Sequence, residues 1–301
     1  MSDQIWVVGE VLIDLIPVEQ EYLPIVGGGP ANTAKALARL GIKSYFIGGI
    51  STDMYGQITK SELLSNNVRL DYVKFLNKPT CIAKIKLSNS GSALYEFVFK
   101  DTATFDFSAS WLPVPDKFIP KLLHIGTLAT AIEPGASELF EWAQSVATFA
   151  PIVFDPNIRP VAISDREQYV AQVERWVSIS SVVKVSDEDI RWLYPSLGIE
   201  QVVNNWLKKG PSLIVVTYGD KGLAGCRLGE KVNVEAVKVK VVDTVGAGDT
   251  VGAVLVEAIV EDGLDSLTGS RLKSMLKRAA KAAAITVSRV GANPPTSEEL
   301  E

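Results

Sequence analysis

A carboxylate beside a glycine-rich turn is the strongest chemical signal in this sequence. The segment Asp243-Thr-Val-Gly-Ala-Gly-Asp249 leads into an apolar run with helical spacing. The amides of Gly246, Ala247 and Gly248 can gather around an anion at the helix N-terminus, where the helix dipole also favours negative charge. Asp249 beside a bound phosphate could take the proton of an attacking hydroxyl, so the segment predicts phosphoryl transfer. The alternative is an aspartate N-cap with glycines that serve a tight turn.

Polar side chains at two other predicted strand ends could hold a hydroxyl-rich substrate. Gly27-Gly-Gly-Pro-Ala-Asn32 stands directly before a helical pattern, and Asp14 ends the first apolar run. Carboxylate and amide groups bind neighbouring hydroxyls well, so Asp14 and Asn32 predict a polyol site. Arg159, in Phe154-Asp-Pro-Asn-Ile-Arg159, could bind a substrate oxygen or a phosphate. The alternatives are a plain strand-to-helix turn for the glycines and a surface salt bridge for Arg159.

Several other residues that can do chemistry give weaker signals. The carboxylates of Lys184-Val-Ser-Asp-Glu-Asp189 could orient a hydrated magnesium ion, but capping of a helix is the simpler interpretation. The glycines of Thr217-Tyr-Gly-Asp-Lys-Gly222 could let a nucleotide lie against the backbone. His124, the single histidine, is expected to be a satisfied structural residue. Cys81 and Cys226 are far apart in the sequence and are expected to be reduced core thiols.

The elements that must position these residues alternate along the chain. Short apolar runs bounded by Gly, Asp or Pro predict strands, and segments with apolar residues at helical spacing lie between them. This order predicts a three-layer α/β/α sandwich with a mainly parallel central sheet. The predicted strands are 5–14, 44–50, 122–126, 152–155, 182–185 and 213–217. The predicted helices are 31–40, 54–66, 137–149, 166–179, 187–194, 199–208, 250–261 and 271–287.

Two stretches depart from this alternation and predict a small additional β-sheet. Residues 21–26 form a short run before the glycine cluster, and residues 80–99 have the pattern of a hairpin with one polar and one apolar face. We interpret them as a lid formed by about 15–27 and 80–105, projecting over the carboxyl edge of the main sheet. The alternative is an antiparallel extension of the main sheet. We expect the whole chain, 1–301, to form a single domain with this lid.

Composition excludes several classes of protein. With 30 basic and 35 acidic residues among 301, the net charge is −5, and no dense stripe of Lys and Arg predicts a nucleic-acid partner. No apolar run approaches the length of a membrane span, and the N-terminus has no pattern of a secretory leader. We therefore expect a cytoplasmic protein with no nucleic-acid or membrane partner.

Together and in this order, the motifs resemble those of the PfkB (ribokinase-like) carbohydrate kinases. The resemblance runs from Gly9 to about Gly291, and Gly-Glu-Val-Leu-Ile-Asp with Asp-Pro-Asn-Ile-Arg is most similar to the fructokinase branch. It implies the same three-layer fold with a β lid, ATP as phosphoryl donor, and Mg²⁺. It also implies Asp249 as the catalytic base, with the amides of Gly246, Ala247 and Gly248 as an anion hole.

The same resemblance implies roles for residues elsewhere in the chain. The residues expected to hold the sugar are Asp14, Gly28, Asn32 and Arg159. The residues expected to line the nucleotide site are Thr217, Gly219, Gly222, Ala283 and Val287. The residues expected around a potassium ion are Asp243, Val245 and Gly291. One departure from the family pattern is visible, since Ser186 and Asp189 stand where the family has Asn and Glu, and Asp189 is the residue expected to face magnesium.

The sequence thus predicts transfer of a γ-phosphoryl group from ATP to a primary hydroxyl of a ketose, with fructose as the leading candidate. Ribose, 2-keto-3-deoxygluconate and nucleosides remain alternative acceptors on the same fold. A non-catalytic sugar- or nucleotide-binding protein is the alternative from another class. A dinucleotide-dependent oxidoreductase is disfavoured, because the glycine cluster lacks Gly-x-Gly-x-x-Gly spacing. The apolar face of the lid predicts a homodimer formed through the lid.

Overall fold

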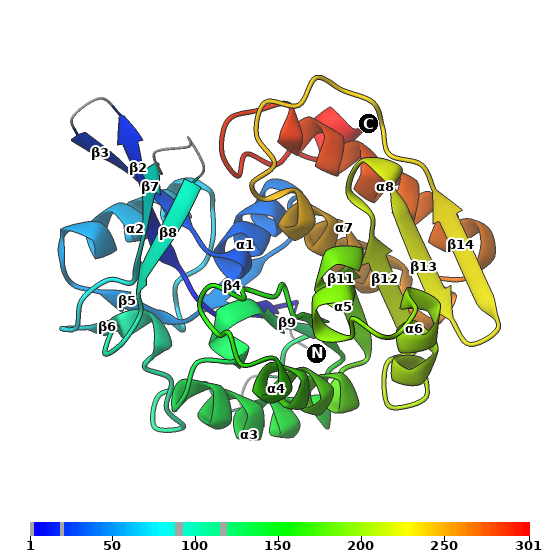
Figure 1. The fold of residues 1–301 in the computed structure, drawn as a ribbon, viewed down its shortest axis with the longest axis horizontal. Coiled ribbons are helices and arrows are strands. Elements are labelled where there is room, and N and C mark those ends of the chain that lie inside the picture. The colour runs from blue at the N-terminus through cyan, green and yellow to red at the C-terminus, as the bar shows by residue number, and fades with distance from the viewer. Residues whose placement is uncertain (1–2, 19–20, 88–92, 115–118) are drawn as a thin grey trace.

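The computed structural model describes residues 3–18, 21–87, 93–114 and 119–301, and its core is an eight-stranded sheet (Figure 1). The strand order is β14-β13-β12-β11-β10-β9-β1-β4, parallel from β4 through β12, with β13 and β14 antiparallel. The strands are β1 (Ile5–Val8), β4 (Ser44–Ile47), β9 (Leu122–Gly126), β10 (Ile152–Asp155), β11 (Val182–Ser186), β12 (Leu213–Thr217), β13 (Leu223–Arg227) and β14 (Glu230–Val234). The predicted parallel sheet is therefore confirmed.

Helices cover both faces of this sheet. The bounds are α1 (Gly29–Arg39), α2 (Met54–Ser65), α3 (Gly135–Ala147), α4 (Arg166–Ile179), α5 (Asp187–Leu193), α6 (Ile199–Leu207), α7 (Ala247–Asp262) and α8 (Gly269–Val287). Alternate residues of β1 pack into different layers, since Ile5 and Val7 join the core under α1, α7 and α8. Trp6 and Val8 join the second core, under α3 to α6. The three-layer prediction is confirmed because each strand buries both faces.

A separate four-stranded sheet stands beside the main sheet (Figure 1). Its order is β3-β2-β7-β8, with bounds β2 (Leu12–Val18), β3 (Glu21–Gly27), β7 (Ile82–Leu87) and β8 (Ala93–Val98). The predicted hairpin is β7 with β8, and it pairs with β2 rather than with the main sheet, so the alternative of an edge extension is wrong. A short parallel pair, β5 (Gly49–Ser51) with β6 (Lys74–Leu76), completes the strands described. The residues between β7 and β8, 88–92, lie outside the described part of the chain.

Two predicted strands are wrong, because the runs 5–14 and 44–50 are each two strands that belong to different sheets. The run 44–50 is divided between β4, in the main sheet, and β5, in the short parallel pair. The run 5–14 matters more for the site. β1 ends at Val8 in the main sheet, and β2 begins at Leu12 in the small sheet. Gly9, with φ +150°, separates them, and a Cβ there would stand 2.3 Å from Pro30 Cγ at the start of α1. A larger residue could not fit where α1 approaches. The consequence is that Asp14 lies within the small sheet and not at the edge of the main one.

Within the described residues, none of the helices combines the length and the apolarity needed to cross a bilayer.

Candidate active site

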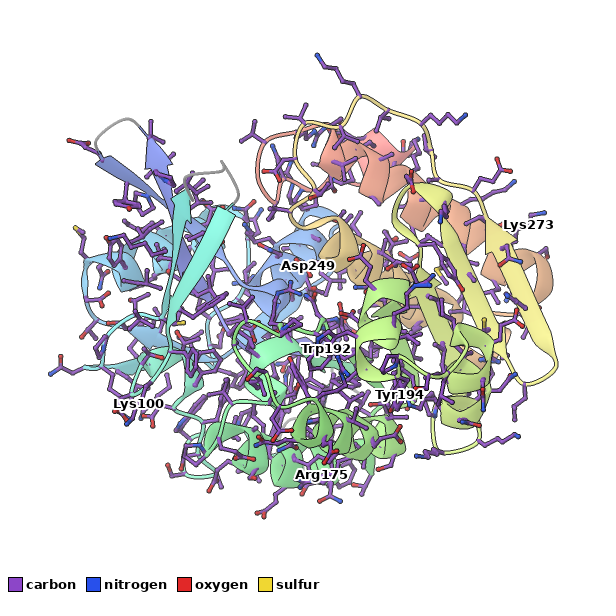
Figure 2. The ribbon with its side chains drawn as sticks, viewed as in Figure 1. Lys100, Arg175, Trp192, Tyr194, Asp249 and Lys273 are labelled. Atoms are coloured by element: carbon purple, nitrogen blue, oxygen red, sulfur yellow. The ribbon has the colours of Figure 1, made fainter. Side chains whose placement is uncertain are left out.

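The first turn of α7 presents Asp249 to the carboxyl edge of the main sheet. Gly246 is the N-cap in the left-handed conformation, φ +80°, and a Cβ there would stand 2.7 Å from the Cβ of Ala292. Both the backbone and the close neighbour therefore require glycine. Asp249 is the third residue of the helix and only 7% exposed. Figure 2 places it near the middle of the molecule, between the small sheet and the C-terminal helices.

A hydrogen bond across the packed helices α1 and α7 joins the two strongest sequence motifs. The Asn32 amide Nδ2 donates to Asp249 Oδ2 at 2.9 Å, although the two residues are 217 positions apart. The Asn32 Oδ1 atom is buried and has no hydrogen-bond partner among the described residues, which leaves an acceptor for a ligand hydroxyl. Burial raises the pKa of Asp249, while the nearby Lys184 ammonium opposes the rise. The arrangement suits a desolvated carboxylate that exchanges a proton with a bound ligand.

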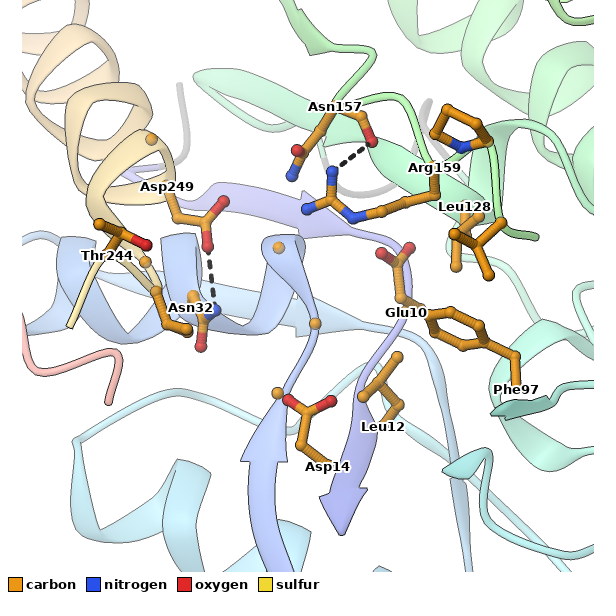
Figure 3. Close-up of a pocket in the computed structure, with 18 of the residues that line it drawn as sticks. Glu10, Leu12, Asp14, Asn32, Phe97, Leu128, Asn157, Arg159, Thr244 and Asp249 are labelled. Carbon is orange, nitrogen blue, oxygen red and sulfur yellow. Dashed lines mark hydrogen bonds between the residues drawn. The ribbon is translucent and has the colours of Figure 1, made fainter. Parts of the chain in front are cut away.

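Asp249 stands in a pocket of about 510 Å³ between the small sheet and the edge of the main one (Figure 3). The predicted site residues that line it are Asp14, Gly28, Asn32, Arg159, Val245, Gly246, Gly248 and Asp249. The volume fits a monosaccharide together with the end of a triphosphate. The structure thus brings together the predicted base and the predicted polyol residues.

The glycine cluster makes room for a ligand at three successive positions. A Cβ on Gly27 would stand 2.2 Å from Asp14 Oδ2, and one on Gly28, at φ +106°, would stand 2.6 Å from the Glu10 carbonyl oxygen. A Cβ on Gly29 would lie 3.2 Å from Asp249 Oδ1. The backbone therefore lies directly against two carboxylates and one carbonyl group of the pocket lining, and the alternative of a plain turn does not account for all three glycines.

Arg159 projects into the same pocket from the loop after β10 (Figure 3). Its Nη1 donates to the carbonyl oxygens of Asn157 at 3.2 Å and of Ile158 at 3.0 Å. Within the described residues it forms no ion pair with a carboxylate, so the salt-bridge alternative is not what the structure shows. Asn157 has φ +38°, which is uncommon for a residue other than glycine and is typical of functional loops. The guanidinium retains donors that face the pocket.

Two charged residues of the pocket were missed from the sequence. Glu10, 3% exposed, follows β1 and accepts hydrogen bonds from the hydroxyl of Thr127 and, at 3.0 Å, from the amide of Ala129. Lys184, 4% exposed, lies within β11 and donates to Asp155 Oδ2 at 2.7 Å. A lysine inside an apolar run that predicts a strand buried on both faces was itself the signal. A charged residue in such a strand indicates a buried ion pair at a functional site.

His124 is buried as expected, but it is not satisfied. Neither ring nitrogen has a hydrogen-bond partner among the described residues, and burial lowers the pKa of His124 to about 4. Its Nε2 lies 3.4 Å from where a Cβ on Gly252 would stand, beneath α7. The expectation of a satisfied histidine is therefore wrong, while its neutral, structural character agrees with the burial.

Comparison with known proteins places this site in a family. The model of the pfkB family carbohydrate kinases matches residues 2–299. The chain belongs to this family. A fructokinase from Rhizobium leguminosarum bv. trifolii is 35% identical over 277 residues, covering 90% of this chain and 83% of that protein. The predictions of the family and of a carbohydrate kinase are confirmed.

Solved structures give the same result for the fold. A fructokinase from Xylella fastidiosa with bound ATP superposes with a TM-score of 0.92 at 23% identity, covering 100% of this chain and 97% of the other. A double mutant of the fructokinase of Vibrio cholerae O395, with fructose, ADP and potassium ion bound, is 28% identical, with a TM-score of 0.88 and coverage of 99% and 96%. The same fructokinase has also been solved with fructose, ADP and calcium ion, at a TM-score of 0.86 and 28% identity.

In this carbohydrate kinase the segment after β11 is a helix cap. The Asp189 amide donates to Ser186 Oγ at 2.9 Å, and the Ser186 amide donates to Asp189 Oδ2 at 3.3 Å, which is a capping box. The other carboxylate oxygen of Asp189 accepts from the Ile158 amide at 3.0 Å. The simpler interpretation of this motif is confirmed, and within the described residues no group of three or more His, Cys, Asp or Glu side chains could hold a metal on its own.

The residues expected around potassium lie together beside α7. Asp243 Oδ1 accepts from the Val245 amide at 3.0 Å, and Oδ2 accepts from the Gly291 amide at 2.9 Å. The end of α8 holds the same segment, because the Val287 carbonyl accepts from the Val242 amide at 2.8 Å. None of the predicted nucleotide residues, Thr217, Gly219, Gly222, Ala283 and Val287, lines the pocket that contains Asp249. Gly222 has a structural reason to be glycine, since a Cβ there would stand 2.1 Å from the Val234 carbonyl oxygen.

Proposed function

We propose that this chain transfers the γ-phosphoryl group of ATP to a primary hydroxyl of fructose. The observation that carries the proposal is the position of Asp249, held by Asn32 at the N-terminus of α7 and open to a pocket lined by polar groups. Relatives that are fructokinases, among them a structure with fructose and ADP bound, support the choice of acceptor and donor.

The proposed reaction uses Asp249 as a base. Its carboxylate takes the proton of the sugar hydroxyl while that oxygen attacks the γ-phosphorus and the bond to the β,γ-bridging oxygen breaks. The Ala247 amide donates to the Thr244 carbonyl at a long 3.4 Å, and the amides of Gly246 and Gly248 have no hydrogen-bond partner among the described residues. These donors can therefore stabilise the negative charge on the phosphoryl oxygens. Water exclusion is provided by the burial of Asp249 and by closure of the small sheet, whose role as a lid remains a prediction.

The sugar is proposed to bind between the small sheet and α1. Asp14 and Asn32 would accept hydrogen bonds from its hydroxyls, the backbone at Gly28 would allow close approach, and Arg159 would donate to a sugar oxygen. The nucleotide is proposed to lie along Thr217, Gly219, Gly222, Ala283 and Val287.

Two metal ions complete the proposal. Mg²⁺ would neutralise the charge of the ATP phosphates and would be carried mainly by those phosphates and by water, with Asp189 facing it. The spare lone pairs of Asp189 and the unpartnered Asp155 Oδ1 fit a hydrated ion better than a protein cage. K⁺ would be held near Asp243, Val245 and Gly291, where it would stabilise the anion-binding turn.

The substrate assignment can be tested with a panel of acceptors. Purified protein with MgATP should release ADP and form a sugar phosphate with fructose at a kcat/KM at least about 10² above that for ribose, 2-keto-3-deoxygluconate and nucleosides. ADP release without any acceptor is the control for hydrolysis. A preference for one of the other acceptors would overturn the fructose assignment, and binding without any phosphorylated product would favour the non-catalytic alternative.

Asp14 is expected to make sugar binding sensitive to pH. Burial raises its pKa to about 6, although Arg159 opposes the rise. The carboxylate therefore becomes protonated as the pH falls through 6 and loses acceptor capacity for sugar hydroxyls. We expect the KM for fructose to rise about fourfold between pH 7.5 and 5.5, while the KM for ATP changes much less.

Asp14→Asn is the matched variant for this effect. It should abolish the added pH dependence of the fructose KM. It should also raise the melting temperature at pH 7.5, because a carboxyl whose pKa is raised in the folded state binds more protons folded than unfolded, which costs stability as the pH rises above 4. A fructose KM that varies with pH equally in both proteins would exclude Asp14 as the titrating group.

We further propose a homodimer formed through the small sheet, in a cytoplasmic location where ATP is available. Apolar side chains are exposed on that sheet at Val18, Tyr22, Leu23 and Val98, each at least 40% exposed. Partner contacts there would bury surface that a monomer leaves in water.

A further inference from the structure

A buried lysine, Lys184, lies in the pocket beside the first turn of α7, and the proposed reaction gives its positive charge no role. Lys184 is 4% exposed, yet it lines the same pocket as Asp249 and Gly248. The strand pattern explains its direction: Val182, two residues earlier in β11, packs into the core under α1, α7 and α8, so Lys184 faces the same layer. Its ammonium therefore ends beneath the first turn of α7.

The identity of Gly248 indicates that space around this ammonium matters. A Cβ on Gly248 would stand 2.9 Å from Lys184 Nζ. Gly248 is not among the glycines with positive φ, so the backbone does not require glycine at this position. Glycine costs a helix about 1 kcal/mol relative to alanine. The close approach of the Lys184 ammonium explains why glycine stands here despite its lower helix propensity.

The Lys184 ammonium is positively charged, and some of its N–H donors have no acceptor among the described residues. Burial opposes the charge, but the Asp155 carboxylate at 2.7 Å prevails, so the pKa of Lys184 lies above its ordinary value. The bond to Asp155 is the only hydrogen bond of this ammonium within the described residues, which leaves two N–H donors. Those donors share the pocket with the first-turn amides of α7.

We propose that Lys184 is a catalytic residue whose ammonium binds the oxygens of the transferred γ-phosphoryl group, with Asp155 as the positioning residue that holds it. The inference rests on the proposed kinase function. Lys184 keeps its proton throughout: the acceptor oxygen bonds to the γ-phosphorus, the bond to the bridging oxygen of ADP breaks, and the hydroxyl proton goes to Asp249. The lysine balances charge that the three phosphoryl oxygens carry in the transition state.

The test compares Asp155→Asn with the double variant Asp155→Asn/Lys184→Met. Lys184→Met alone would leave a buried carboxylate unpaired and could unfold the protein, whereas the double variant removes both charges. Relative to Asp155→Asn, the double variant should bind a non-hydrolysable ATP analogue about 10- to 100-fold more weakly by calorimetry, with ADP affinity changed less than about threefold. The kcat should fall about 10²-fold with little change in the fructose KM, and Lys184→Arg should recover part of it.

Lys35→Met is the control for loss of a buried lysine. Lys35 is also 4% exposed, but it pairs with Glu62 at 3.4 Å and does not line the pocket. This variant should lower the melting temperature without changing the ratio of the two nucleotide affinities. Equal weakening of ADP and the ATP analogue by the double variant, or a loss of stability alone, would overturn the proposal in favour of a structural ion pair. If the unmodified protein phosphorylates no acceptor, the proposed function fails, and the affinity ratio still decides the role of Lys184.

Discussion

Asp249→Asn should reduce kcat by at least about 10³-fold while leaving fructose affinity within a few-fold of the unmodified protein. The substitution removes the proposed acceptor of the hydroxyl proton, and general bases typically contribute 10²- to 10⁴-fold. An asparagine oxygen can still accept the hydrogen bond from Asn32 Nδ2 that is 2.9 Å long in the native protein, so the pocket should keep its shape. Steady-state kinetics with fructose and calorimetric binding of fructose measure the two effects separately.

Stability provides an internal check on this variant. The pKa of Asp249 is raised mainly by burial, so the folded protein holds its proton more tightly than the unfolded chain does. Ionisation therefore costs stability as the pH rises above the ordinary range of aspartate, and the neutral Asn should raise the melting temperature at pH 7.5. Asp262→Asn, at the exposed end of the same helix, is the control and should change neither kcat nor the melting temperature. Near-native turnover by Asp249→Asn would exclude it as the base.

Gly29→Ala should reduce kcat/KM for fructose by about 10²-fold or more. The added Cβ would stand 2.7 Å from Thr127 Cγ2, 3.1 Å from Asn157 Nδ2 and 3.2 Å from Asp249 Oδ1. It therefore forces groups on three sides of the pocket to move, and a misplacement of about 1 Å at a reacting centre can cost about 10²-fold in rate. Gly29 is not in the left-handed region and opens a helix, so alanine introduces no backbone strain.

The controls for Gly29→Ala separate crowding from general damage. Gly198→Ala is the matched variant, because Gly198 is the N-cap of α6 and so also stands at the start of a helix. A Cβ on Gly198 would meet nothing within 4 Å. It should leave kcat/KM unchanged. ADP affinity should be preserved in both variants, since the crowded atoms lie on the sugar side of the site. If Gly29→Ala bound and phosphorylated fructose normally, the sugar could not lie against this part of α1.

Local patterns were sufficient to predict the layers and the base. Each strand of the parallel sheet is a short apolar run because helices cover both of its faces. Consecutive residues are therefore buried on opposite faces, and the sequence shows this as an unbroken apolar segment. The turn before α7 could be recognised for the same reason. Gly246 satisfies a local backbone requirement at φ +80°, and Asp249 lies three residues further along.

Local patterns failed where two sheets share one run of sequence. The run 5–14 is apolar apart from Gly9, Glu10 and Asp14, and these residues alone do not reveal the change from β1 to β2. The close contact between Gly9 and Pro30 marks it, and that contact exists only after α1 has packed. The burial of Glu10 and the hydrogen bonds that it accepts from residues after β9 could not be predicted from its neighbours.

The sequence by itself determined the fold class, the glycine turn before α7 and the candidate base, because each depends on burial or backbone conformation within a few residues. Only the tertiary structure decided what surrounds that base. Packing of α1 on α7 brings Asn32 to Asp249 across 217 residues, and the parallel pairing of β10 with β11 sets Asp155 against Lys184 beneath Gly248. Polar groups this far apart in the chain interact strongly only when the fold brings them together and excludes the water between them. The partners of Asp249 and Lys184 are therefore properties of the folded protein.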